Sequence, residues 1–117
     1  MTNTNNLSPG EIALQYTKAL TKHDYDTAYT MTSTQYQSQV PSTQMREAFE
    51  TMISDDWGPI GPIEVAGTMT EWANKHPEDV EWVYVTIPGD VYSEAVTVVI
   101  TRQGRELKIR EVEFGRP

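Results

Sequence analysis

The sequence predicts one α+β domain in which three helices precede four antiparallel strands. Apolar residues recur at helical spacing up to residue 53, and they alternate with a period of two from residue 63 onward. Gly58-Pro59 and Gly61-Pro62 separate the two halves, because such pairs break regular structure. Helices followed by strands indicate the α+β class instead of a wound parallel sheet. A length of 117 residues fits a single domain.

The first half of the chain predicts helices over residues 9–21, 25–38 and 42–54. Ser8 and Glu11 have the spacing of a capping box, and the proline that follows Ser8 suits the first turn of a helix. Asp24 is a typical cap for the second helix. The later part of that helix is rich in Thr, Ser and Gln, so its helix propensity is weak. Val40-Pro41 ends it before the third helix begins.

The second half predicts strands over residues 63–72, 80–87, 91–101 and 106–114. Gly67 interrupts the first of these and indicates a β-bulge in a long bent strand. Pro88-Gly89-Asp90 and Gln103-Gly104 supply the turns of two hairpins. The four strands are therefore predicted to pair antiparallel.

Two of these strands are apolar on both faces, namely residues 81–87 and 95–100. An antiparallel strand with one solvated face is apolar on the other face only. Three short helices cover one face, and no further segment is predicted to cover the second, so we expect a second copy there in a symmetric homodimer. The predicted interface residues are Trp72, Trp82, Tyr84, Tyr92 and Val98. The alternative is that Trp82, Tyr84 and Val98 are surface residues that the fold tolerates singly.

The composition excludes several classes of function. Nine Lys and Arg residues against seventeen Asp and Glu give a formal net charge of −8, which argues against binding nucleic acid or an anionic membrane surface. Without cysteine there is no disulfide, thiolate metal site or cysteine nucleophile. The two histidines, His23 and His76, fall in predicted loops, so neither a metal nor another cofactor is expected. Basic residues concentrate in the last hairpin and tail, where we interpret them as protection of a strand edge.

The termini and hydropathy bear on localisation. Residues 1–7 are polar and aperiodic, and we interpret them as a flexible leader before a domain of residues 8–117. The chain has neither the pattern of a signal peptide nor an apolar run long enough for a membrane span. It is therefore expected to be cytoplasmic as written, with a trimmed exported form as the alternative.

Aromatic residues are the best candidates for a binding site. By helical periodicity Tyr16 and Tyr29 face inward, where they are predicted to line a pocket for a small apolar ligand between helices and sheet. Trp57, just before Gly58-Pro59, is predicted to close one end of this interior. The alternative is that both tyrosines are core residues with satisfied hydroxyl groups.

The segment Ala13–Ala28, in which one helix ends in a short turn and the next begins at Asp24, resembles the opening of the nuclear-transport-factor-2-like superfamily. The C-terminal order of Val98-Val99-Ile100, a turn, Leu107–Arg110 and Glu113-Phe114-Gly115 is similar to the last strands of that superfamily. The resemblance spans residues 8–114 and is closest to small bacterial domains of unknown function. It implies a cone-shaped fold with the helices on the concave face of a strongly bent sheet.

The resemblance also allows a comparison with the ketosteroid isomerases of that superfamily. Tyr16 falls at the position of their oxyanion-binding tyrosine, whereas the positions of their two carboxyl groups fall on Val40 and near Thr97. A tyrosine alone does not abstract a carbon-bound proton at neutral pH, so no catalytic residue is assigned. We expect a non-catalytic module for ligand binding or assembly, with Thr97 among its ligand-binding residues. The alternative is a small lyase or isomerase of the ketosteroid isomerase or polyketide cyclase type that uses Tyr16 and an acid not yet placed.

Overall fold

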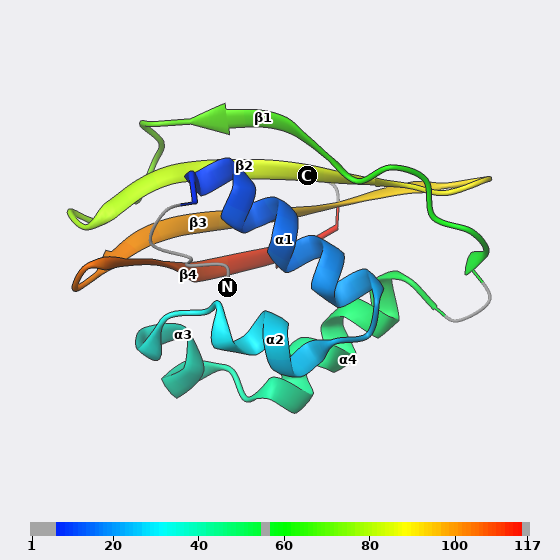
Figure 1. The fold of residues 1–117 in the computed structure, drawn as a ribbon, viewed down its shortest axis with the longest axis horizontal. Helices are drawn as coiled ribbons and strands as arrows, with labels where there is room; N and C mark the ends of the chain where they lie inside the picture. The colour runs from blue at the N-terminus through cyan, green and yellow to red at the C-terminus, as the bar shows by residue number, and fades with distance from the viewer. Residues whose placement is uncertain (1–6, 55–56, 116–117) are drawn as a thin grey trace.

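A computed structural model describes residues 7–54 and 57–115, and it has the α+β class that the sequence predicts (Figure 1). The helices are α1 (Pro9–Thr21), α2 (Tyr25–Thr30), α3 (Thr34–Gln39) and α4 (Ser42–Met52), and the strands are β1 (Glu64–Met69), β2 (Asp79–Pro88), β3 (Ser93–Gln103) and β4 (Glu106–Phe114). The strands form one antiparallel sheet in the order β1-β2-β3-β4. No helix in the described ranges is both long and apolar enough to cross a membrane.

Helix α1 has the predicted bounds because its start is encoded locally. The Ser8 hydroxyl accepts a hydrogen bond from the Glu11 backbone N–H at 3.2 Å, and the Glu11 carboxylate accepts one from the Ser8 backbone N–H at 3.0 Å. This capping box satisfies two backbone donors that a helix start otherwise leaves free. Most of the predicted leader lies outside the described residues, but Leu7 packs against the hydrophobic core.

The prediction of one helix over residues 25–38 is wrong, because the chain divides it into α2 and α3. Between them the backbone pairs with β4: Ser33 N–H donates to the Ile109 carbonyl at 2.7 Å, and Ile109 N–H donates to the Met31 carbonyl at 2.9 Å. The Ser33 hydroxyl then accepts from Tyr36 N–H and caps α3. Pairing with a distant strand therefore outweighs the weak helix propensity of this stretch.

All four predicted strands are present, although β1 is shorter than predicted, β2 is one residue longer at each end, and β3 begins and ends two residues later. Strand β1 ends at Met69, so Trp72 lies in the loop that follows and not in the strand. The register of β1 against β2 shifts between Val65 and Gly67, which places the predicted bulge at Ala66. In the β3–β4 turn Gly104 has a φ of +64°, a conformation that glycine adopts without strain.

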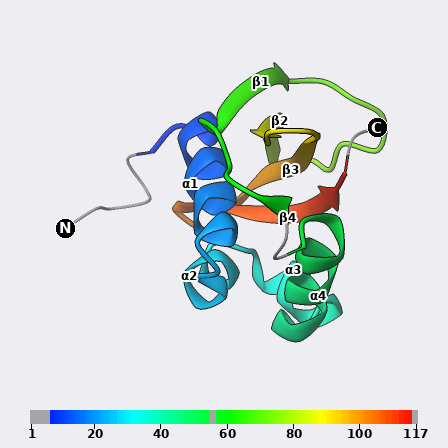
Figure 2. The same cartoon turned by 90° about the vertical axis from the view of Figure 1, so that its right-hand side faces the viewer.

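The helices cover one face of the sheet, which curls without closing (Figure 2). Cross-strand partners such as Val83, Val98 and Val112 point toward the helices and form rows of the core. The largest fully buried side chains are Tyr16, Phe49, Ile12, Leu20, Met45, Ile87, Ile100, Ile109, Val83, Val85, Val96 and Val98. Val98 therefore lies under the helices and does not reach the opposite face, which we call the outer face.

Candidate functional site

The interior between helices and sheet is packed around Tyr16. This residue is fully buried, and its hydroxyl lies near that of Tyr36 but forms no well-formed hydrogen bond with any described residue. Tyr29 is only half-buried, and its hydroxyl donates to the Val40 carbonyl at 2.8 Å. Neither tyrosine lines any of four surface hollows found on the described residues.

Electrostatics also limit the chemistry of these tyrosines. Burial raises the pKa of Tyr16 well above its ordinary value, and the neighbouring Tyr36 raises it further. Burial likewise raises the pKa of Tyr36 to about 12. Both phenols are therefore neutral near pH 7, and neither serves as a base there.

The other two predicted ligand-binding residues lie elsewhere. Trp57 lines a hollow at one end of the domain with His23 and Phe49. It packs directly on the β2–β3 hairpin, where a Cβ atom at Gly89 would come within 2.7 Å of the Trp57 ring. Thr97 projects from β3 to the outer face, away from Tyr16. The four residues thus occupy three separate places.

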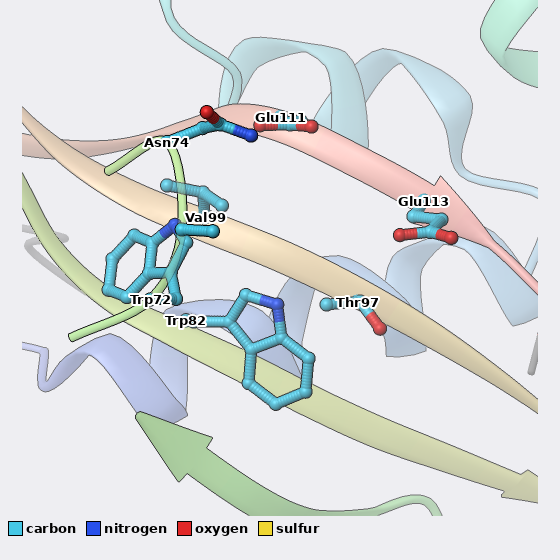
Figure 3. A pocket seen from close by; sticks show the side chains of 8 residues that line it. Trp72, Asn74, Trp82, Thr97, Val99, Glu111 and Glu113 are labelled. Atoms are coloured by element: carbon cyan, nitrogen blue, oxygen red, sulfur yellow. The ribbon is translucent and has the colours of Figure 1, made fainter. Parts of the chain in front are cut away.

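The outer face carries a hollow of about 170 Å³, which we call the outer hollow (Figure 3). The residues that line it are Trp72, Ala73, Asn74, Trp82, Thr97, Val99, Glu111 and Glu113. They come from β2, β3 and β4 and from the loop between β1 and β2, residues 70–78, at the left in Figure 1. The loop folds back over the outer face, so the prediction that no segment remains to cover this face is only partly right.

Register explains how the outer hollow is built. Trp82, Val99 and Glu111 lie directly opposite one another on adjacent strands. A second row of the same kind lies two residues further along each strand and consists of Tyr84, Thr97 and Glu113. Side chains two apart on a strand share a face, so both rows point outward. The result is an aromatic wall on β2, a floor on β3 and an acidic wall on β4.

Aromatic contacts hold the aromatic wall and the loop in place. The Trp82 and Tyr84 rings stack with centroids 6.2 Å apart and planes 9° apart. In the loop the Lys75 ammonium lies 5.4 Å from the centroid of the Trp72 ring. The same ammonium donates to the Thr70 carbonyl at 2.6 Å and pairs with Glu71 at 3.1 Å. These contacts orient Trp72 before any partner binds.

The predicted interface residues are only partly brought together. Trp72, Trp82 and Tyr84 are half-buried on or over the outer face. Tyr92 is 65% exposed and lies in the β2–β3 hairpin, at the right of Figure 1, beyond the far end of β2. Val98, as described above, belongs to the core.

A buried ion pair beside the outer hollow was not predicted. The Arg110 guanidinium donates two hydrogen bonds to the Asp79 carboxylate, at 2.8 and 2.7 Å, and the side chains are 10% and 0% exposed. The His76 backbone N–H also donates to Asp79 at 2.8 Å. The pair thus ties the end of the 70–78 loop to β4 across the intervening strand. The basic composition of the last hairpin is the only sequence signal, and it led us to interpret Arg110 as an edge charge.

We expect this pair to make stability depend on pH under acidic conditions. Burial raises the pKa of Asp79, but hydrogen bonds from Arg110, His76 and Thr101 outweigh it, so the net pKa is lowered. The folded protein thus holds the ionised form more strongly than the unfolded chain, whose Asp pKa is about 3.9. The stabilisation is present above that value and is lost as the pH falls through the lower, folded pKa.

Urea denaturation of the wild type and of Asp79→Asn over a series of pH values measures this effect. The difference in unfolding free energy between the two proteins should be constant above about pH 5 and shrink below about pH 4. A difference that stays the same down to about pH 2 contradicts the assignment.

Comparisons with known proteins do not assign this chain to a family. No protein-family model matches the chain, and no curated protein matches it. Within residues 7–54 and 57–115, no group of three or more His, Asp or Glu side chains is placed to hold a metal ion. The class that the structure defines is therefore a small α+β domain with a helix-covered face and an aromatic, acidic outer face.

Proposed function

We propose that this chain is a non-catalytic binding module of the nuclear-transport-factor-2-like superfamily, and that the outer face of its sheet is the binding surface. The order of helices followed by a curled four-stranded antiparallel sheet is compatible with that superfamily. The observation that carries the proposal is the contrast between the two faces. Tyr16 is fully buried in the core, whereas the outer face carries a hollow lined by aromatic and acidic side chains.

The alternative of a lyase or isomerase that uses Tyr16 has less support. An oxyanion-binding tyrosine has to contact a substrate, and Tyr16 is fully buried. Thr97, near the position of the second acid, lies on the opposite face of the sheet, and Val40 carries no carboxylate at the position of the base.

A second copy of the chain is the other candidate for the outer face. Half-buried Trp72, Trp82 and Tyr84 favour it, because aromatic residues are enriched in interfaces. The exposed carboxylates of Glu111 and Glu113 on the same face would approach those of the partner and limit such a dimer. Sedimentation at micromolar concentration separates the cases: twice the chain mass of 13.3 kDa supports the dimer, and 13.3 kDa excludes it.

Fragment screening by NMR tests the binding surface itself. Each of the three tryptophans carries one indole N–H group that NMR detects, and of these residues Trp72 and Trp82 line the outer hollow. We expect small-molecule hits to shift the signals of Trp72 and Trp82 and to leave that of Trp57 unchanged. Hits that cluster at Trp57, or that displace the core signals around Tyr16, would overturn the proposal.

A further inference from the structure

The two walls of the outer hollow differ in chemistry and stand at a defined separation. Trp82 on β2 and Glu111 on β4 flank Val99, so two strand spacings separate them, which is about 9.6 Å. Between these two strands lies the floor at Val99, and the hollow of about 170 Å³ that both side chains line leaves room for one compact group. Figure 3 shows Trp82 on one side of the outer hollow and both glutamates on the other.

The size of the outer hollow limits what it can hold. Its volume of about 170 Å³ is near the roughly 150 Å³ of an engineered protein cavity that takes up benzene. Pockets for drug-sized ligands start at about 300 Å³. A group of four to six heavy atoms, such as a quaternary ammonium or a guanidinium, has the matching size.

The charge of the outer hollow selects a cation. None of the side chains that line it is basic, whereas two are glutamates. Glu113 forms no ion pair with any described residue. The Glu111 carboxylate lies 3.6 Å from the Arg110 guanidinium, which makes its shorter contact of 2.7 Å with Asp79. Indole rings attract cations placed over their faces. The Lys75 ammonium over Trp72 is such a contact, but Lys75 does not line the outer hollow and so does not fill it.

The floor adds a polar group that is independent of the glutamates. Thr97 is 6% exposed, and its side chain lines the outer hollow. In Figure 3 its side chain lies between Trp82 and Glu113. A ligand in the outer hollow that offers a hydrogen bond to the Thr97 hydroxyl gains a polar contact beside the charged one.

We propose that the outer hollow binds a compact organic cation, held between the Trp72 and Trp82 rings and the Glu111 and Glu113 carboxylates. This inference rests on the proposed function, because it names the ligand class of the same surface. The cation is either a free small molecule, such as a quaternary ammonium compound, or a basic side chain that a partner peptide presents. The charged group is the shared chemistry of both sources.

Titration with choline and with 3,3-dimethylbutan-1-ol, its uncharged isostere, tests the role of charge. We expect choline to shift the Trp72 and Trp82 indole signals at a concentration at least about tenfold lower than the isostere does, and to leave Trp57 unshifted. Added salt should weaken the choline response. A short arginine-containing peptide forms a second arm, and tighter binding by the peptide than by choline assigns the cation to a partner protein.

Variants test the walls separately. Glu111→Gln with Glu113→Gln should weaken choline binding about tenfold, and both side chains are exposed, so folding is not at risk. Glu64→Gln removes the same charge from β1 away from the outer hollow and should change nothing. Trp82→Leu should abolish the response of Trp72, provided that the variant keeps the thermal midpoint of the wild type.

Each outcome has a defined meaning. Equal binding of choline and its isostere, or an unchanged affinity in the double glutamine variant, overturns the cation proposal. If choline fails while other fragments still shift Trp72 and Trp82, the cation proposal is lost and the outer face remains a binding surface. If no fragment shifts either signal and the chain sediments at 13.3 kDa, both proposals fail.

Discussion

Replacement of Arg110 by alanine is expected to lower the unfolding free energy by about 3–5 kcal/mol. The guanidinium is 10% exposed and makes both of its short hydrogen bonds to Asp79, whose side chain is fully buried. Removal of the arginine leaves a buried carboxylate without its counterion, and such a group is far costlier than the net value of an intact pair. The release of Asp79 should also loosen the 70–78 loop, so the indole signal of Trp72 should move.

Arg105→Ala is the matched control, because Arg105 is exposed in the β3–β4 turn. Its substitution should change stability by no more than about 0.5 kcal/mol. Urea denaturation of the three proteins at pH 7 measures both effects. A loss below about 1 kcal/mol for Arg110→Ala, in the range of an exposed ion pair, would contradict the role given to the pair.

The second large effect is expected at Tyr16. Tyr16→Ala removes a fully buried ring and should cost about 3–5 kcal/mol. Tyr16→Phe removes only the hydroxyl, which is buried without a well-formed hydrogen bond. The substitution should therefore leave the unfolding free energy unchanged or raise it by at most about 3 kcal/mol. Tyr29→Phe is the contrasting control, because it deletes a hydrogen bond to the Val40 carbonyl and should cost about 1 kcal/mol.

Thermal and urea denaturation of these variants also bear on the enzymatic alternative. A Tyr16→Phe variant that is clearly less stable than the wild type would show that the hydroxyl has a partner in the folded protein. A variant of equal stability that loses turnover of an isomerase or lyase substrate would instead restore Tyr16 as a catalytic group.

Local signals account for the elements that the sequence predicts well. Helix α1 has the predicted bounds because Ser8, Pro9 and Glu11 act within one turn. Strand β4 likewise has its predicted bounds, because Gly104 supplies the turn that precedes it. The break between α2 and α3 was missed because its cause, the pairing of Met31 and Ser33 with Ile109, lies far away along the chain.

The candidate site was predictable only in part, for a related reason. Residues 95–100 are apolar on both alternations, so periodicity identifies two covered faces without showing which of Thr97 and Val98 meets the helices. Packing against the helices decides this, and it places Val98 in the core and Thr97 on the outer face. Trp72, Trp82 and Tyr84, which we predict as interface residues, lie on or over the outer face, and what covers that face is still a prediction.

The sequence by itself determined the class, the order of the elements and most of their bounds, because caps, turns and hydrophobic periodicity act over a few residues. Only the tertiary structure decided that Tyr16 is fully buried, that Asp79 pairs with Arg110, and that Trp72 and Glu111 line the same hollow. Asp79 and Arg110 are 31 residues apart, and no local pattern encodes a contact at that separation. Such contacts arise from strand register and from the path of a loop, and both are set by the packing of the whole domain.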